Sequence, residues 1–394
     1  MLIDPELGQR QFRSLMLRDP ILTQIGERLH TAQRNHLGYP YNLIGRSPVP
    51  AKLAGYLVNN LGDPYHGSQY GADVCDLERE VVDWLMDLWE VDEPDAYWGS
   101  VGASGTEGNF WALYLAREAL PDAIVVCSRE AHYSIPKAAR ILRMPVRVVD
   151  CEPSGAMSLA SLRSTLSRLR SSQVIVATTC GTTMKGAHDD IGAIISVLDE
   201  SGFPDHRRFV HVDGALNAMV LPFLDNAPQG LKPSFRHGVD TISTSGHKMI
   251  GAPMPCGILV SRRKHVDRIA SAVSYIRSHD TTFMGSRNGH AVLALWARLF
   301  GHGVKGFRRD SRLGVKRAEA LATKLRWEGV PVLLNPFSLT LVLPEPDEAT
   351  VTLYQLACSG GDTHAIVMPS VSDDLLERFV TSYLNWWKSR PQHA

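Results

Sequence analysis

Short apolar runs alternate with longer stretches of helical periodicity through the middle of the chain. The length of these runs and their content of valine and isoleucine favour buried strands. They lie at residues 123–127, 145–149, 174–178, 209–212, 241–243 and 257–260. The stretches between them predict helices at 108–119, 136–142, 159–169 and 191–200. This alternation is typical of an α/β fold with a mainly parallel sheet and helices on both faces.

The pattern changes near residue 300. Helical periodicity at 308–327 is followed by apolar runs at 332–334 and 339–343, which predict a second, smaller α/β unit. At about 150 residues per domain, a chain of 394 residues is long enough for two units around one site. The expected organisation is an N-terminal segment (1–60), a large domain (61–300) and a small C-terminal domain (301–394).

Composition narrows the choice of partner. Lys plus Arg and Asp plus Glu number 41 each, so no overall field attracts nucleic acid or an anionic membrane. A hydrophobic content of 44% and a charged content of 21% are ordinary for a globular protein. We therefore expect a small molecule as the partner.

Cysteine usage and the start of the chain indicate a compartment. The six cysteines form no C-x-x-C pair, and the opening M-L-I-D-P-E-L-G-Q-R lacks the apolar core of a secretory signal. No apolar run reaches the roughly 18 residues of a transmembrane helix. The sequence therefore predicts a reduced, soluble, cytoplasmic protein.

One lysine lies in a distinctive stretch. Lys248 follows small residues and a histidine in S-T-S-G-H-K-M, and G-A-P-M-P-C-G comes soon after. The glycines and prolines favour an irregular, rigid loop. A desolvated, unprotonated lysine can attack an aldehyde to form an imine, and pyridoxal phosphate is the commonest biological aldehyde that uses this chemistry. An exposed lysine beside a turn is the alternative interpretation.

Two further groups suit the carboxyl edge of a parallel sheet, where ligands bind. The run G-A-S-G-T-E-G-N at 102–109 leads into a helix, whose first N–H groups can hold a phosphate. It matches neither G-x-G-x-x-G nor a Walker A sequence, and a plain turn with a helix cap is the alternative. His132 follows the strand at 123–127 and can stack on an aromatic ring or handle protons, unless it is a structural histidine.

Asp213 and Thr182 also follow predicted strands. Asp213, in H-V-D-G-A, can keep a pyridinium nitrogen protonated, and the small Ala215 leaves room for a flat ring; helix capping is the alternative. Thr182 can bind a phenolic oxygen or a carboxylate, or can serve as a turn hydroxyl. A rival metal site would use side chains whose spacing matches no H-E-x-x-H motif or i, i+4 helix pair. Its candidate ligands are His188, Asp189, Asp190, His211 and Asp213.

The order of these groups resembles that of pyridoxal-phosphate-dependent group II amino-acid decarboxylases. The similarity is closest to the branch that contains Gram-negative bacterial histidine decarboxylase and plant serine decarboxylase. The motifs that carry it are H-L-G-Y-P-Y-N-L from His36, N-N-L-G-D-P-Y from Asn59, G-T-E-G-N from Gly105, A-H-Y-S around His132, G-T-T-M-K-G-A from Gly181, H-V-D-G-A from His211, S-G-H-K-M-I-G-A-P-M-P-C-G from Ser245 and G-S-R-N-G-H from Gly285. The resemblance implies a fold-type I structure that converts an L-amino acid into a primary amine and CO2.

The resemblance also implies roles for single residues. Lys248 would bind the cofactor covalently and Asp213 would pair with its pyridine nitrogen, while Ala215 and His132 would pack on opposite faces of the ring. Thr182 would lie near the 3′-oxygen of the cofactor or near the substrate carboxylate. The implied phosphate ligands are Gly105, Thr106, Ser245 and His247.

The same resemblance predicts a homodimer in which Ser286 and its loop reach the active site of the partner subunit. After CO2 leaves, the substrate carbon must be protonated. Lys248, His132 and a tyrosine from a mobile loop of the partner are the candidates. Many relatives have a longer mobile loop, and residues 276–284 are its expected local equivalent.

Substrate choice rests on the expected pocket lining, which offers no obvious counter-ion for a charged side chain. These residues are Tyr39, His66, Tyr70, Met284 and Ser286. A neutral side chain is therefore expected, with histidine, serine, valine and leucine all open. Transamination, aldol cleavage and β-elimination stay as alternative reactions, because one fold hosts many chemistries. A transaminase would need an arginine to grip the α-carboxylate, and Arg287 is the candidate.

Overall fold

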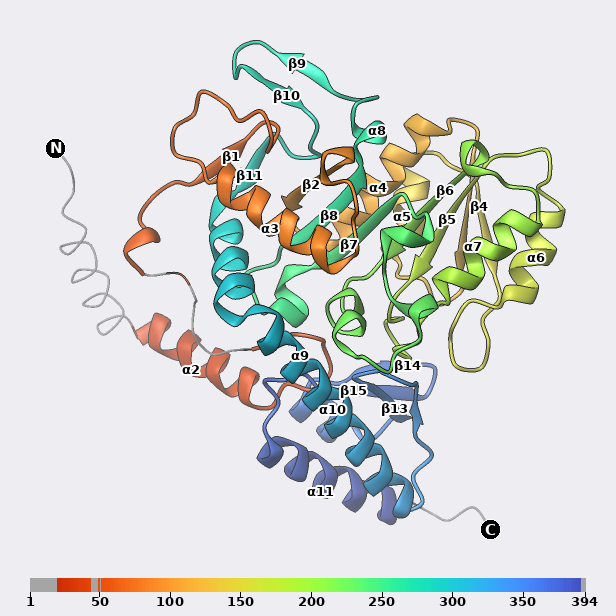
Figure 1. Cartoon of the computed structure of the whole chain (residues 1–394). Helices are drawn as coiled ribbons and strands as arrows, with labels where there is room; N and C mark the ends of the chain where they lie inside the picture. Colours follow the sequence, from red (N-terminus) through yellow and green to blue (C-terminus); the bar gives the residue numbers. More distant parts are fainter. Residues whose placement is uncertain (1–19, 44–48, 50, 391–394) are drawn as a thin grey trace.

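The computed structural model describes residues 20–43, 49 and 51–390, so the predicted absence of a secretory signal falls on residues outside this part of the chain. The described residues form a seven-stranded sheet with the order β2-β8-β7-β6-β5-β3-β4 (Figure 1). The strands are β2 (Tyr97–Gly102), β3 (Ile124–Ser128), β4 (Val146–Val149), β5 (Val174–Thr179), β6 (Arg208–Asp213), β7 (Thr241–Ser245) and β8 (Gly257–Arg262). Strands β3 to β7 run parallel, and β8 lies antiparallel between β7 and β2. This confirms the mainly parallel sheet predicted from the apolar runs.

The sheet is buried on both faces, which explains why its strands are continuous apolar runs. Successive side chains of a strand point to opposite faces. Val174 and Val176 of β5 accordingly join one apolar core, whereas Ile175 and Ala177 join the other. Helices cover both faces (Figure 1). They are α3 (Cys75–Leu88), α4 (Gly105–Ala119), α5 (Ser134–Ile141), α6 (Leu159–Ser167) and α7 (Ile191–Glu200).

Strand β2 is absent from the predicted elements. Its sequence, Y-W-G-S-V-G, contains two glycines, which weaken any strand pattern. Gly99 is needed there because a Cβ would lie 2.6 Å from Cγ1 of Val82 on α3. The close approach of α3 therefore requires glycine at position 99, and this glycine weakens the sequence pattern by which the strand could be predicted.

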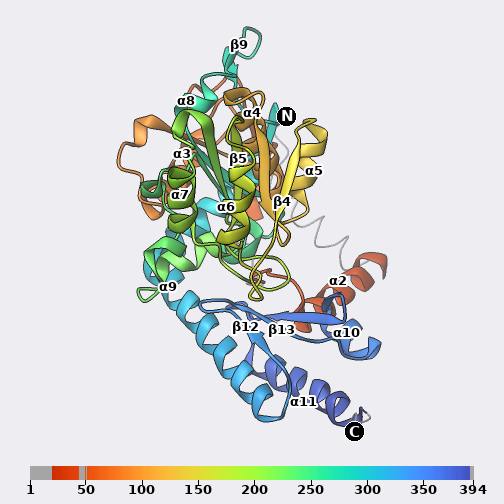
Figure 2. The ribbon, with the colours of Figure 1, turned by 90° about the vertical axis from the view of Figure 1, so that its right-hand side faces the viewer.

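A second sheet lies near the C-terminus, as the apolar runs beyond residue 330 predict. It is antiparallel, with the order β12-β13-β15-β14. Its elements are β12 (Leu333–Leu334), β13 (Thr340–Pro344), β14 (Ala357–Ser359) and β15 (Asp362–Ile366), with helices α10 (Glu348–Tyr354) and α11 (Asp373–Ser389). Figure 2 shows α9 (Gly289–Trp327) running from the large sheet to this smaller one. The predicted boundary at residue 300 falls within α9, close to Gly303, whose φ is 63°; the division into domains stays a prediction.

Two pairs of short antiparallel strands lie outside the two larger sheets. β1 (Asn59–Leu61) pairs with β11 (Ser286–Asn288), and β9 (Ser271–Val273) pairs with β10 (Ser278–Asp280). Residues 276–284, the expected loop equivalent, thus include β10. Thr281 in this segment donates its hydroxyl to Asp63 Oδ2 at 2.6 Å. This hydrogen bond holds the segment 276–284 against the residues that follow β1.

The N-terminal segment joins the two sheets. Its described part starts with α2 (Pro20–Arg34), and residues 37–42 then pass between the C-terminal sheet and the loop after β7. The carbonyl of Leu37 accepts from the Ile366 N–H at 2.8 Å, and the Asn42 N–H donates to the carbonyl of Lys248 at 3.3 Å. None of the helices in the described part of the chain is long and apolar enough to cross a membrane. All six cysteines lie within the described residues and are free thiols.

Candidate active site

A cavity of about 340 Å³ opens at the carboxyl ends of β5, β6 and β7. It gathers most of the site residues that the sequence predicts. These are Tyr39, Gly105, Thr106, His132, Thr182, Asp213, Ala215, Ser245, His247 and Lys248. Tyr39 comes from the segment after α2, and the others end or follow five strands of the large sheet, whose topology brings these five connections to one edge.

The loop after β7 is held so that Lys248 faces this cavity. Residues Gly246–Ile250 form a short π-helical turn, which Lys248 interrupts with φ −88° and ψ −114°. Asn42 stabilises this turn, because its side-chain N–H donates to the carbonyl of Met249 at 3.0 Å. A Cβ on Gly246 would lie 2.5 Å from Cys256 Sγ, so this glycine is needed for the loop to pack.

The surroundings of Lys248 make its amine a better nucleophile. Burial lowers the pKa of Lys248 from its ordinary value, and the nearby Asp213 carboxylate opposes that shift. A lowered pKa raises the fraction of amine that is unprotonated at neutral pH, which is the form that attacks a carbonyl.

The start of α4 forms an anion cradle beside the lysine loop. Ser104 is the N-cap, with its hydroxyl accepting from the Glu107 N–H at 3.3 Å. Gly105 begins the helix, and a Cβ there would lie 2.4 Å from Ser245 Oγ and 3.8 Å from the Ala215 Cβ. Backbone N–H groups at a helix N-terminus point toward a bound anion. The absence of a side chain at Gly105 leaves this end of the cavity open beside Ser245.

Gly105→Ala tests this cradle. The added methyl group is expected to push Ser245 or the helix N-terminus out of place and to lower the affinity for pyridoxal phosphate about tenfold or more, because a hydrogen bond to a charged group is worth about 1.5–3 kcal/mol. Fluorescence titration of the cofactor into the cofactor-free protein measures the change. Gly55→Ala is the matched control, since a Cβ at Gly55 meets nothing within 4 Å. Equal affinities for both variants would contradict the cradle.

Asp213 and His132 both line the cavity. Asp213 is buried at the end of β6, with Oδ1 accepting from the Ala215 N–H at 3.2 Å and Oδ2 accepting from Asn109 Nδ2 at 2.7 Å. His132 precedes α5, and its Nδ1 lies 2.7 Å from Ser134 Oγ. Burial lowers the pKa of His132, Asp213 opposes the shift, and Lys248 and Lys137 add to it. The ring of His132 is therefore neutral at physiological pH.

Two predicted phosphate or substrate ligands also make local structural contacts. His247 Nδ1 lies 3.0 Å from the carbonyl and 3.2 Å from the N–H of Cys256, and its ring packs at a tilt against Tyr41. Thr182 Oγ1 accepts from the Ala187 N–H at 3.0 Å, as a turn hydroxyl does. Both side chains still line the cavity.

Sequence reasoning missed several lining residues. Asn217 is buried in the cavity wall, and its Oδ1 has no hydrogen-bond partner among the described residues. The C-terminal sheet contributes the opposite wall, with His364 Nε2 placed 2.9 Å from the carbonyl of Gly38. The other lining residues of that wall are Thr340, Ala357 and Ile366. No sequence motif identifies the residues of the C-terminal sheet as site residues, because they reach the site only through the packing of the two sheets.

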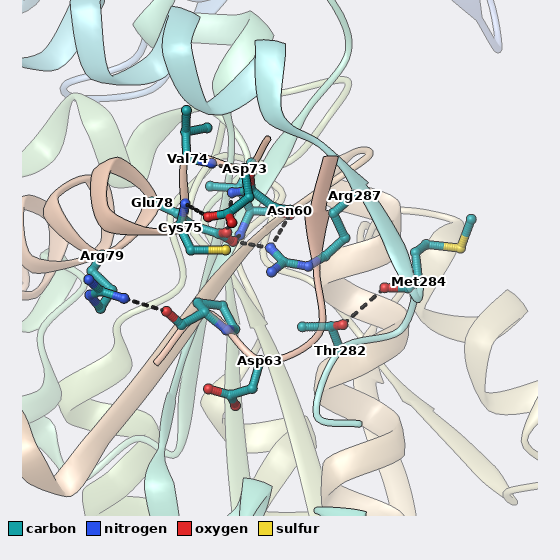
Figure 3. A network of polar contacts seen from close by, with 12 residues as sticks. Asn60, Asp63, Asp73, Val74, Cys75, Glu78, Arg79, Thr282, Met284 and Arg287 are labelled. Carbon is teal, nitrogen blue, oxygen red and sulfur yellow. Dashed lines mark hydrogen bonds and ion pairs between the residues drawn. The ribbon is translucent and has the colours of Figure 1, made fainter. Parts of the chain in front are cut away.

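The other predicted substrate residues do not line this cavity in the described part of the chain. The Tyr70 hydroxyl donates to the carbonyl of Leu57, and Ser286 Oγ accepts from Asn59 Nδ2 at 3.2 Å. His66 packs edge-on against His279. Met284 lies in the segment before β11, where its carbonyl accepts from Thr282 (Figure 3). Within one chain, then, these residues lie apart from Lys248.

Arg287 is committed to a buried ion pair. Its guanidinium donates to the Glu78 carboxylate and, through Nη2, to the carbonyl of Gly62 at 3.0 Å. Asn60 donates to the same carboxylate at 2.7 Å (Figure 3). The described residues that line the cavity include no arginine. The carboxylate grip expected of a transaminase is therefore not provided by Arg287 in this chain.

The proposed metal ligands have other partners. Asp189 accepts from the N–H groups of Met157 and Thr179, each at 2.7 Å. Asp190 caps α7, and His211 is bonded to Asn109 and Thr241. In the described ranges of the chain, no three His, Cys, Asp or Glu side chains are grouped so as to hold a metal ion.

Comparison with known proteins assigns this fold and site to a family. Residues 47–342 match the pyridoxal-dependent decarboxylase conserved domain. The chain belongs to the family of pyridoxal-dependent decarboxylases. It is a pyridoxal-phosphate-dependent amino-acid decarboxylase of group II, as its motifs predict.

Individual relatives are similar along nearly the whole chain. Serine decarboxylase 1 of Oryza sativa subsp. japonica is 40% identical over 96% of this chain and 77% of its own length. Histidine decarboxylase of Pseudomonas entomophila (strain L48) is 35% identical over 93% of this chain and 92% of its own. The crystal structure of L-methionine decarboxylase from Streptomyces sp. 590 superposes with a TM-score of 0.82 at 26% identity, covering 98% of this chain and 96% of that one.

The residues present fit pyridoxal phosphate. Its phosphate suits the N–H groups at the start of α4, where Gly105 leaves room beside Ser245. Its aldehyde suits Lys248, whose lowered pKa favours the free amine. Its pyridine nitrogen suits the buried carboxylate of Asp213, which keeps such a nitrogen protonated. The cavity thus offers a fitting partner for the phosphate, the aldehyde and the ring nitrogen of the cofactor.

Proposed function

We propose that the protein decarboxylates an L-amino acid with a neutral side chain, such as histidine, serine or an aliphatic amino acid. The observation that carries this proposal is the composition of the cavity wall around Lys248. Among the described lining residues, the ionisable groups other than the tyrosines are Asp213, Lys248 and three histidines, and none is an arginine or a glutamate. The names of the relatives, serine and histidine decarboxylases, support the same class of substrate.

The roles proposed for the chain's own residues follow from their positions. Lys248 holds the cofactor covalently, and Asp213 pairs with its ring nitrogen. Ala215 and His132 pack against the ring, and Thr182 lies near the 3′-oxygen or the substrate carboxylate. The proposed phosphate ligands are Gly105, Thr106, Ser245 and His247. When bound, pyridoxal phosphate withdraws electrons from the bond to the substrate carboxylate, and the carboxylate of Asp213 stabilises the positive charge that this requires.

A homodimer is proposed as the working form. Ser286 and Tyr70 do not line the cavity of their own chain, and the segment before Ser286 exposes the large apolar side chains of Tyr275, Phe283 and Met284. An exposed apolar surface of this kind marks an interaction site. In the proposed dimer, Ser286 and the segment 276–284 reach the cavity of the partner subunit. A tyrosine from the partner then stays a candidate for protonating the substrate carbon. A cytoplasmic location is proposed as well, which the free thiols support.

The substrate is identified by supplying amino acids one at a time. We expect the purified protein with pyridoxal phosphate to form a primary amine from histidine, serine, valine or leucine, with a kcat/KM for glutamate or lysine lower by about 10²-fold or more, because a buried charge without a counter-ion is costly. Mass spectrometry of the products gives the answer. A preference for a charged amino acid would contradict the proposed substrate class.

A further inference from the structure

Asn109 lines the cavity from α4, where this helix meets β6 and β7, and is 2% exposed. Its Oδ1 accepts from Ser243 Oγ and from His211 Nε2, each at 2.9 Å. Its Nδ2 donates to Asp213 Oδ2 at 2.7 Å and to Ser134 Oγ at 2.9 Å. Because an amide offers two acceptor lone pairs and two donor hydrogens, these bonds use its whole capacity.

The orientation of this amide is determined by its partners. A carboxylate only accepts, so the NH2 group must face Asp213. His211 Nδ1 lies 2.9 Å from Thr241 Oγ1, which can donate to it, and Nε2 then carries the proton that goes to Asn109. Burial lowers the pKa of His211 to about 4, so this ring is neutral and carries one proton. Turning the amide over would place its oxygen against the carboxylate.

The second amide hydrogen of Asn109 is connected to His132 through the hydroxyl of Ser134. Ser134 Oγ accepts from Asn109, so its own hydrogen is directed to His132 Nδ1, 2.7 Å away. The backbone N–H of Ser134 also donates to Nδ1, at 3.3 Å. Nδ1 is therefore an acceptor, and the ring proton lies on Nε2. Within the part of the chain that the structure describes, Nε2 has no hydrogen-bond partner, and His132 lines the cavity.

We propose that Asn109 is a positioning residue that orients the Asp213 carboxylate and, through Ser134, fixes the tautomer of His132 so that an N–H donor faces the cavity. His132 then offers a hydrogen bond to an acceptor atom of the bound cofactor and substrate and does not accept a proton from them. The identity of these ligands rests on the proposed function. The tautomer itself does not, because it is determined by bonds within the protein.

The tautomer is measured by NMR of the full chain labelled with 15N at histidine, both without cofactor and with pyridoxal phosphate added. We expect His132 to give the pair of 15N shifts of an unprotonated Nδ1 and a protonated Nε2. In Asn109→Ala, Ser134 Oγ becomes free to accept, so a form protonated at Nδ1 becomes populated. Ser134→Ala is the milder variant if Asn109→Ala does not fold, and it should also populate that form. Ser134→Thr keeps the hydroxyl and should restore the wild-type signal.

The matched control is Ser128→Ala. Ser128 is buried just before His132 on the chain, and its hydroxyl has no partner among the described residues. This change should leave the His132 signal as in the wild type. In the loaded enzyme, Ser134→Ala should lower kcat about fivefold, the effect of one lost hydrogen bond, with little change in KM.

Protonation of His132 at Nδ1 in the wild type, or an unchanged signal in both Asn109→Ala and Ser134→Ala, would overturn the proposal. If instead the chain forms no amine while the tautomer behaves as expected, the proposed function fails and this inference stands.

Discussion

Lys248→Ala is expected to lose the visible absorption of covalently bound pyridoxal phosphate and to lower kcat/KM roughly 10⁴-fold or more, because removal of a group on which the reaction depends has effects of this size. Lys248 is the lysine that lines the cavity, among the residues described, and its lowered pKa suits it to hold the cofactor. Absorption spectra and the rate of amine formation give the two readouts.

The control for this change is Lys185→Ala. Lys185 lies on the neighbouring loop after β5, and its Nζ pairs with Glu130 at 3.2 Å. The control should keep both the absorption band and most of the activity. A Lys248→Ala protein that still shows the band would contradict the assignment of the cofactor lysine.

The same lysine should cost the fold some stability. Its pKa is lowered in the folded chain, so the unfolded chain binds more protons between that lowered value and the ordinary 10.5. The contribution of this group to the free energy of unfolding therefore rises with pH through that window. At neutral pH the buried amine lowers the stability of the fold. Cofactor-free Lys248→Met should accordingly be at least as stable as the wild type at pH 7. Stability is thus given up at this position for reactivity.

Arg287→Met is expected to lower the free energy of unfolding by about 3–5 kcal/mol, because breaking a buried ion pair leaves a charge without a partner. The Glu78 carboxylate is 0% exposed and also accepts from Asn60 Nδ2 and the Val101 N–H, each at 2.7 Å. Glu78 of α3 thereby joins β1, β2 and β11, and Figure 3 shows it beside Asn60 and Arg287. Urea denaturation of the cofactor-free protein at a fixed concentration measures the loss.

Two further variants separate this pair from an ordinary ion pair. The double variant Glu78→Gln with Arg287→Met should recover part of the lost stability, since it removes the unpaired charge. Arg129→Met breaks the exposed pair with Asp150, whose side chains are 71% and 68% exposed, and should have a much smaller effect. A loss for Arg287→Met no larger than for Arg129→Met would show that the buried network does not stabilise the fold.

Much of the large sheet is predictable because burial on both faces leaves a strong signal. The predicted strands at 174–178 and 241–243 became β5 (Val174–Thr179) and β7 (Thr241–Ser245), and the helix at 191–200 has the predicted bounds. The site follows from the same topology, because residues after parallel strands meet at one edge. Lys248 and Asp213 therefore line one cavity although 35 residues, by their numbers, separate them.

The missed features depend on packing that no local pattern records. Asn109 stands in the G-T-E-G-N motif, yet its link between Asp213 and Ser134 exists only once α4 lies against β6. The wall formed by the C-terminal sheet likewise depends on how two sheets meet. Tyr70 and Ser286 were predicted to contact substrate, and that prediction now depends on a second copy of the chain.

The products formed from a reactive amino acid test the central claim most directly. A substrate labelled with 13C at the carboxyl group should release labelled CO2 and a primary amine in equal amounts, in a reaction that needs both pyridoxal phosphate and Lys248. A keto acid that retains the label, or the same products from Lys248→Ala, would contradict a decarboxylase built around this lysine.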